Sequence, residues 1–300
     1  MTTQKAMTTR AWAEMGFLSL LWGGSFLAVG LAAPVAGATT TVALRVGGAC
    51  LLLWAWVLWR GLPLPRGPRV WGALLVMGVF NNALPFSLIA WGQLSIESGL
   101  AGILNASTAV FGVLVAATVF RDERLTATKA AGVALGLAGV VTVIGPASLG
   151  DLDATSLAQL AVLGASLSYA LSGALARLAL GGLAPEAAAA GMLTSSAAIM
   201  LPAALVLDGV PQAGWVPSVW LGILYLAVMS SALAYLIFYR LLRLVGAGNA
   251  SLTTLLVAPV AVVLGALVLH EDLPGRAYAG FAVLALGLLV IDGRLGGARA

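Results

Sequence analysis

The chain has 300 residues, of which 61% are hydrophobic and 9% are charged, and its formal net charge is +4. A soluble domain carries about 25% charged residues, so this composition excludes a chain built mainly of water-facing domains. The basic residues lie at the ends of apolar runs and do not form one patch, so the positive charge does not indicate a nucleic-acid partner.

Long apolar runs follow one another along the whole chain. A bilayer core is about 30 Å thick, so a spanning helix needs on the order of 20 apolar residues. The runs are continuous and do not alternate as in membrane strands, and breaks at Pro, Gly and charge clusters divide them into ten segments. We expect an all-α polytopic membrane protein without a separate soluble domain. To within about 2 to 4 residues, the segments cover residues 12–33, 38–60, 71–92, 97–120, 126–146, 155–178, 185–207, 216–240, 246–269 and 274–292.

The first segment follows Lys5 and Arg10, as the apolar part of a signal peptide would. It is long enough to span a bilayer, so we interpret it as an uncleaved first helix.

The basic residues predict the orientation of the ten segments. Arg45 lies inside a segment and Arg276 lies at a connection on one side. The others all fall on the opposite side: Lys5, Arg10, Arg60, Arg66, Arg69, Arg121, Arg124, Lys129, Arg177, Arg240, Arg243, Arg294 and Arg299. Because cytoplasmic loops are rich in Lys and Arg, we expect both termini to be cytoplasmic and the protein to lie in a cell inner membrane.

The two halves of the sequence resemble each other at an offset of about 148 residues, where Glu123 and Leu125 superpose on Glu271 and Leu273. An offset that contains five helices, an odd number, places the halves in opposite orientations. The sequence therefore predicts two inverted five-helix repeats, residues 1–148 and 149–300, with a central cavity between them. This layout is typical of secondary transporters, whose substrate sites lie near the bilayer midplane.

Aromatic side chains at mid-span are the first candidates for a substrate site. Trp22 lies at mid-span, its approximate repeat partner is Tyr169, and Ser25 and Ser172 match at the same offset. One interpretation is a pair of aromatic rings that line a cavity and contact an organic substrate, and the alternative is ordinary helix packing.

Polar side chains at span depth form a second group of candidates, because hydrocarbon offers them no hydrogen-bonding partner. They either bind substrate in a polar-lined cavity or join helices to each other. The substrate-binding set predicted for the whole chain is Trp22, Ser25, Phe26, Asn81, Asn82, Asn105, Thr108, Tyr169, Ser172, Ser230, Ser231, Tyr235 and Thr253.

Three further residues inside the segments need a structural reason. Pro85 and Pro259 predict helix kinks, which act in gating or are static. Arg45 lies about seven residues from the start of its helix, so we expect its long stem to carry the charge to the nearer interface, a structural role.

No residue pattern predicts catalysis, a metal site or a cofactor. The carboxylates lie at or near predicted helix ends, so none is expected to act as a buried proton relay. The single histidine, His270, and the single cysteine, Cys50, cannot supply a usual zinc site or an internal disulfide. An intramembrane enzyme acting on lipid would need such groups at depth.

Several motifs together resemble the drug/metabolite transporter superfamily and its EamA family. They are the ten helices in inverted halves, the stretch from Trp22 to Phe26, Arg45 in the second helix and the turn at residues 121–125. Within the family, the chain is similar to YddG-type exporters of amino acids, including aromatic ones, and of some toxic organic cations. The resemblance implies a cavity formed by helices one to four and six to nine, with helices five and ten peripheral. It places Trp22, Asn82, Tyr169 and Ser231 close to the substrate path.

We therefore expect an exporter of small amphipathic metabolites, amino acids first, that works by alternating access as facilitated diffusion or exchange. Its partners would be the small-molecule substrate and membrane lipids, and the sequence leaves the oligomeric state open, with a monomer compatible. The alternatives are a lipid-modifying intramembrane enzyme and a membrane scaffold that transports nothing.

Overall fold

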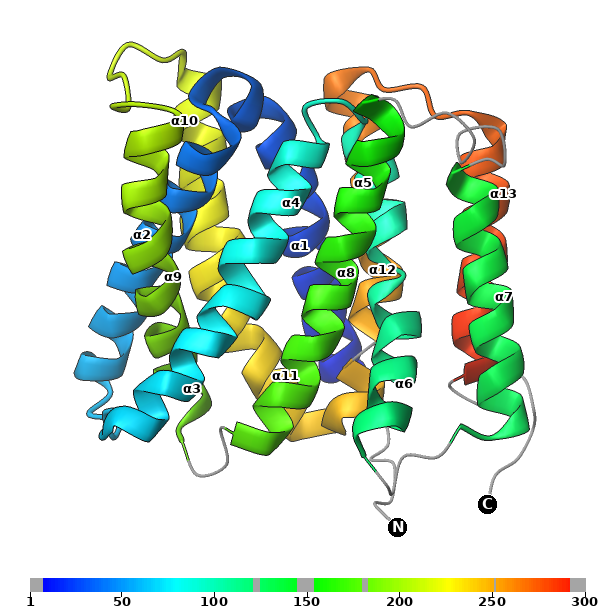
Figure 1. The fold of residues 1–300 in the computed structure, drawn as a ribbon, viewed down its shortest axis with the longest axis horizontal. Coiled ribbons are helices and arrows are strands. Elements are labelled where there is room, and N and C mark those ends of the chain that lie inside the picture. The colour runs from blue at the N-terminus through cyan, green and yellow to red at the C-terminus, as the bar shows by residue number, and fades with distance from the viewer. Residues whose placement is uncertain (1–7, 121–124, 145–153, 180–182, 251, 292–300) are drawn as a thin grey trace.

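The structure is a computed structural model that describes residues 8–120, 125–144, 154–179, 183–250 and 252–291 (Figure 1). The predicted boundary between residues 148 and 149 lies outside these ranges.

The described residues form helices, and some consecutive helices join end to end into one rod, which gives ten rods in all (Figure 1). The third rod joins α3, η1 and α4, the fourth joins α5 and α6, the eighth joins α10, η3 and α11, and the ninth joins α12 and η4. The bounds are α1 Thr9–Ala36, α2 Ala38–Trp59, α3 Pro68–Gly78, η1 Val79–Ala83, α4 Leu84–Gly92, α5 Ser98–Asn105, α6 Thr108–Val119, α7 Ala127–Ile144, α8 Ala154–Ala179, α9 Pro185–Leu207, α10 Pro217–Leu224, η3 Tyr225–Leu233, α11 Ala234–Ala250, α12 Leu252–Leu264, η4 Gly265–Leu269 and α13 Gly275–Ile291.

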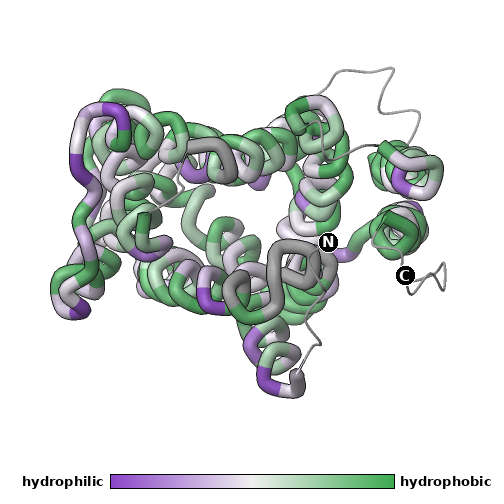
Figure 2. The backbone as a smooth tube through the Cα atoms, turned by 90° about the horizontal axis from the view of Figure 1, so that it is seen from below, coloured by the Kyte–Doolittle hydropathy of each residue, from purple (hydrophilic) through white to green (hydrophobic). Residues whose placement is uncertain are grey.

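Within the described residues, eight rods are long and apolar enough to cross a membrane, and the stretch Leu256–Leu269 and α13 are shorter apolar helices. Large apolar side chains cover the outside of the bundle; Leu51 is 74% exposed and Val206 is 83% exposed. Hydrophobic residues run through most of the rods in Figure 2. Such a surface suits lipid and not water, which confirms the expected polytopic helical membrane protein.

The fourth rod differs from the prediction of one continuous segment over residues 97–120. It breaks between Asn105 and Thr108. The Ser107 hydroxyl donates to the Leu104 carbonyl at 2.7 Å, and the Thr108 hydroxyl donates to the Asn105 carbonyl at 2.7 Å. Both carbonyls would otherwise accept the helix's own amides, so these local bonds compete with the helix and end α5.

The eighth rod is longer than predicted, because α11 continues from the expected end at residue 240 to Ala250. The strongly apolar part of the rod ends at Leu241, and this end of the apolar run is what the prediction from the sequence was based on. The following residues contain no helix breaker before Gly246, so the helix continues past the apolar span. The ninth rod accordingly begins at Leu252 instead of residue 246.

Successive rods run in opposite directions, so successive connections lie alternately on the two faces of the bundle (Figure 1). We call the face where α1 begins and α13 ends the terminal face, and the other the opposite face. The third rod and α7 begin at the terminal face, whereas α13, which is the repeat counterpart of α7, begins at the opposite face. This arrangement is the one that an inverted repeat requires.

Packing between the rods follows the same two-fold pattern. The second rod packs on its counterpart α9, and α7 packs on its counterpart α13. The first rod packs on α12 of the ninth, and the sixth rod, α8, packs on α5 and α6 of the fourth. Each half therefore completes its core with the other half, and neither half forms a separate bundle.

Helices α7 and α13 stand as a pair at one end of the molecule (Figures 1 and 2). Glycines bring their backbones into contact. A Cβ atom on Gly139 would lie 2.5 Å from the Leu284 amide nitrogen, and one on Gly287 would lie 2.6 Å from the Gly136 amide nitrogen. No side chain fits at such distances, so the pair depends on small residues, as in other membrane helix contacts. The peripheral place expected for the fifth and tenth helices is the one that the structure shows.

We predict that Gly139→Ala and Gly287→Ala each lower the unfolding temperature of the detergent-purified protein, because backbone atoms of the facing helix must move. Overpacking of this kind costs about 1–3 kcal/mol. The control is Gly72→Ala, since an added Cβ atom at that position meets nothing within 4 Å. Equal melting temperatures for all three variants would contradict the close contact.

Candidate functional site

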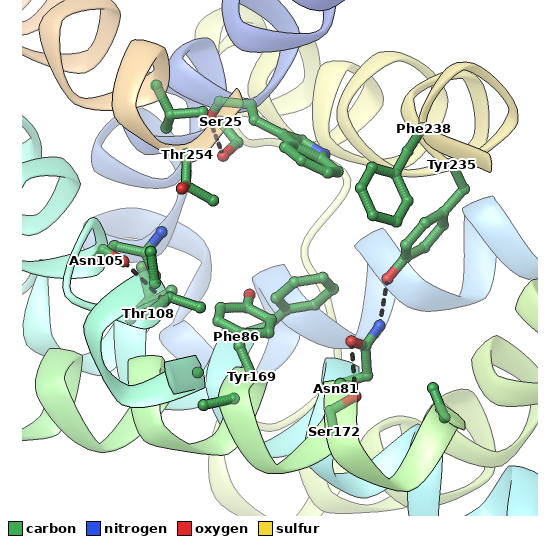
Figure 3. Close-up of a pocket in the computed structure, with 18 of the residues that line it drawn as sticks. Ser25, Asn81, Phe86, Asn105, Thr108, Tyr169, Ser172, Tyr235, Phe238 and Thr254 are labelled. Atoms are coloured by element: carbon green, nitrogen blue, oxygen red, sulfur yellow. Dashed lines mark hydrogen bonds between the residues drawn. The ribbon is translucent and has the colours of Figure 1, made fainter. Parts of the chain in front are cut away.

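A cavity of about 710 Å³ lies between the two halves and is lined by residues from all ten rods; Figure 3 shows part of its wall. Ten of the thirteen predicted substrate-binding residues line it: Trp22, Ser25, Phe26, Asn81, Asn105, Thr108, Tyr169, Ser172, Ser230 and Tyr235. A cavity of this size suits a small organic molecule, because ligand pockets measure about 300–1,000 Å³.

The other three predicted residues lie behind the cavity wall. Asn82 is fully buried, and its Oδ1 accepts the hydrogen bond that the Tyr235 hydroxyl donates. The Ser231 hydroxyl accepts a hydrogen bond from Arg45 at 2.9 Å. Thr253 is also fully buried, and its carbonyl accepts from Ser19 at 3.4 Å. These residues orient the wall or join rods, and they do not face the cavity.

A chain of hydrogen bonds crosses one side of the cavity (Figure 3). The Ser172 hydroxyl of α8 donates to Asn81 Oδ1 of η1 at 2.9 Å, and Asn81 Nδ2 donates to the Tyr235 hydroxyl of α11 at 3.0 Å. The Tyr235 hydroxyl in turn donates a hydrogen bond to Asn82 Oδ1. Three rods are thereby connected through groups that also face the cavity, so substrate contact and helix joining are not alternatives here.

Two π-helical turns each supply one polar residue of this wall, Asn81 and Ser230, and they are approximate repeat counterparts. In the third rod η1 contains Asn81 and Asn82, and in the eighth rod η3 contains Ser230 and Ser231. Pro85 follows η1 and has no amide hydrogen to donate, which interrupts the ordinary ladder. Pro259 lies within α12, which remains α-helical around it. Whether either proline acts in gating stays a prediction.

Arg45 corrects the expectation that its charge reaches the interface. The side chain is only 7% exposed and lines the cavity. Nε donates to Ser231 at 2.9 Å, Nη2 donates to Ser230 at 3.2 Å, and Cζ lies 3.6 Å from the centre of the Phe86 ring. These partners satisfy the guanidinium inside the bundle, so its stem does not need to extend to the membrane surface.

Aromatic rings form the apolar part of the wall. Trp22 packs against Phe238 with ring centres 5.4 Å apart, and Tyr169 packs edge-on against Phe86 at 6.4 Å. Tyr235 stacks with the next residue on its helix face, Tyr239, at 6.1 Å. All of them line the cavity.

The sequence prediction missed Phe86, Phe238 and Thr254 as cavity residues. Phe86 follows the kink at Pro85, and Phe238 lies between the two stacked tyrosines in sequence, which are the only signals that the sequence offers. Thr254 follows the predicted residue Thr253 directly in the sequence and lies at the same depth.

The cavity opens towards the terminal face. At that end its lining residues Phe120, Lys129 and Tyr239 are partly exposed. At the other end the lining residues Thr41 and Val42 are at most 1% exposed. The described conformation therefore gives access from one side of the membrane.

Carboxylates hold helix starts together at the covered, opposite face. Glu271 accepts from the Ser98 amide at 2.7 Å, the Ser98 hydroxyl at 3.0 Å and the Gly99 amide at 2.9 Å. Asp208 accepts from the Thr40 amide at 2.6 Å. Each carboxylate binds the positive end of a helix from a different rod, so together they stabilise closure on this side.

We predict that Glu271→Ala opens the opposite face, because the start of α5 loses three hydrogen bonds. The assay uses a cysteine placed at Ala109 in the cavity, in a Cys50→Ser background, and an impermeant maleimide added to one face at a time. In the parent the label should enter from the terminal face, and in Glu271→Ala from both faces. The matched control is Asp272→Ala, whose exposed side chain makes no described hydrogen bond. Unchanged labelling in Glu271→Ala would show that this contact does not close the face.

Apolar rods in two inverted halves around a polar and aromatic cavity that opens to one side define a membrane transporter of small molecules. Comparison with known proteins then gives the family. The sequence matches the EamA-like transporter family over residues 12–145 and 156–292, one copy in each half, and the chain belongs to this family. The resemblance noted in the sequence is thus confirmed, and the protein is a transporter and not an enzyme.

Relatives and a solved structure agree with this assignment. A probable terminal-alkyne amino-acid exporter of Streptantibioticus cattleyicolor is 32% identical over 219 residues, 71% of this chain and 70% of the relative. An uncharacterized transporter of Archaeoglobus fulgidus is 22% identical over 94% of this chain and 98% of its own length. A crystal structure that is 20% identical superposes with a TM-score of 0.69 over 97% of this chain and 99% of the other, which shows the fold.

Proposed function

We propose that this transporter exports amino acids, aromatic ones included, by alternating access. The single observation that supports this most is the composition of the cavity wall, which has aromatic rings around one part and the amide and hydroxyl groups of Asn81, Ser172 and Tyr235 on another. An amphipathic metabolite with a polar backbone and an apolar side chain suits such a wall. The relative in Streptantibioticus cattleyicolor, named as an amino-acid exporter, adds support.

The proposal includes the expected setting of the protein. Both termini are cytoplasmic and the membrane is a cell inner membrane, because basic residues gather at rod ends on the terminal face (Figure 1). Arg60 and Arg66 lie between the end of α2 and the start of α3, and Lys129 lies in the first turn of α7. With this orientation, the described conformation is open to the cytoplasm, from which an exporter takes its substrate. One chain supplies the cavity wall, so a monomer suffices for the proposed transport.

Toxic organic cations are less well suited to this cavity than amino acids. In the part of the wall that the structure describes, no lining residue is acidic, so a cation finds no carboxylate to pair with. A membrane scaffold that transports nothing would not need such a cavity. We therefore restrict the proposed substrates to amino acids and related metabolites.

We predict that the purified protein in proteoliposomes exchanges labelled phenylalanine for internal unlabelled phenylalanine, and that Trp22→Ala weakens this exchange. Loss of the aromatic contact should raise the half-saturating concentration about threefold to tenfold for phenylalanine, with a smaller change for alanine. The matched control is Trp91→Ala, because Trp91 is largely exposed on the outside. Absence of exchange for every amino acid tested would refute the proposed function.

We predict that transport follows the substrate gradient without a proton gradient. No described carboxylate is among the cavity-lining residues, and Glu14 is held by Arg10 and Arg240, each at 3.1 Å. The measurement is phenylalanine uptake into proteoliposomes with an imposed substrate gradient, with and without a protonophore. Uptake should be unchanged, and a stop in uptake on adding the protonophore would mean that transport is proton-coupled.

A further inference from the structure

Within the described part of the chain, the positive charge of Arg45 has no negative partner. Arg45 makes two hydrogen bonds, to the neutral hydroxyls of Ser230 and Ser231. No described carboxylate lies within ion-pair distance of it, and no acidic residue occurs among the described cavity-lining residues. A charge that is more than nine-tenths buried normally has a partner of opposite sign, so its absence here requires a reason.

The guanidinium also keeps hydrogen-bonding capacity in reserve. It has five N–H donors on three nitrogens, and in the described residues Nη1 donates to no protein atom. Arg45 is more than nine-tenths buried and lines the cavity, so this unused donor group is available only to a molecule inside the cavity.

Its neighbours fix the orientation of the guanidinium without neutralising it. Two serines hold Nε and Nη2, and the Phe86 ring covers one face of the plane at 3.6 Å from Cζ. An acidic residue at either serine position would form an internal ion pair and remove the charge. Serine hydroxyls hold the geometry and leave the charge for a ligand, which is how a pre-organised anion site is built.

We propose that Arg45 binds the carboxylate of the transported molecule, so that the cavity selects molecules with a carboxylate and rejects organic amines that lack one. This inference rests on the proposed function and names the group by which the substrate is recognised. A planar guanidinium matches a carboxylate through parallel N–H donors, and the aromatic residues Trp22 and Tyr169 remain for the apolar part of the same molecule.

The first test uses the native protein and four related probes as competitors of phenylalanine exchange. Phenylalanine and 3-phenylpropionate carry the carboxylate, whereas phenethylamine and phenylalanine amide do not. The carboxylates should compete at concentrations at least about tenfold lower than the other two, because a charge-assisted hydrogen bond is lost without the carboxylate. Phenethylamine that competes as well as phenylalanine would overturn the inference while leaving amino-acid transport intact.

The second test determines whether Arg45 is the residue that produces this selectivity. In Arg45→Gln, the ratio between the inhibitory concentrations of phenylalanine amide and phenylalanine should fall from about tenfold or more to about one. Arg45→Lys keeps a positive charge and should retain part of the ratio. The matched control is Arg276→Gln, because Arg276 is exposed at the opposite face. A ratio that survives in Arg45→Gln would place the selectivity elsewhere.

A binding measurement separates this inference from the proposed function. In thermal unfolding of the detergent-purified protein, 3-phenylpropionate should raise the unfolding temperature of the native chain and of Arg276→Gln, but not of Arg45→Gln. If no amino acid is exchanged and this shift is still present, the proposed transport is wrong and the anion site stands. If exchange occurs and 3-phenylpropionate gives no shift in the unfolding temperature beyond that of phenethylamine, the proposed transport stands and the anion site is wrong. Should Arg45→Gln fail to fold, Arg45→Lys and the native competition series decide.

Discussion

Hydrocarbon cannot hydrogen-bond, and this constraint arranges the whole molecule. Backbone groups in the membrane must pair within helices, and polar side chains must find partners inside the bundle. Tyr235 lies between Asn81 and Asn82, and Arg45 is held by two serines. Because these partners come from different rods, the same bonds that satisfy the polar groups also assemble the halves around one polar space. The polar lining of the cavity therefore follows from the hydrocarbon surroundings as well as from the fold.

The number of rods and the inverted arrangement of the two halves could be predicted because each depends on a long signal. An apolar run of about twenty residues and an offset shared by many positions survive local irregularity. The depth of a polar residue also follows from its place in a run, so Asn81, Ser172 and Tyr235 were predicted at the cavity, where the structure places them.

The rest depends on contacts that a sequence does not display. Arg45 and Ser231 are 186 positions apart, so the stem length of Arg45 could be weighed but its acceptors could not be known. The break after Asn105 depends on which carbonyl each hydroxyl chooses, and both choices fit the same residues. Whether Phe86 and Phe238 face lipid or cavity depends on helix rotation near a π-helical turn, which shifts the ordinary period.

The two halves are alike but not identical. Pro259 lies within α12 of the ninth rod, whereas the corresponding position of the fourth rod, at the offset of 148 residues, is Phe111 in α6. Perfect internal symmetry would relate the inward-open and outward-open forms of an inverted-repeat carrier by a two-fold rotation in the membrane plane and give them the same free energy. An asymmetric pair of rods removes that degeneracy. The empty carrier then spends unequal time facing the two compartments, and a preference of this kind needs no energy source, only a sequence whose two copies have diverged.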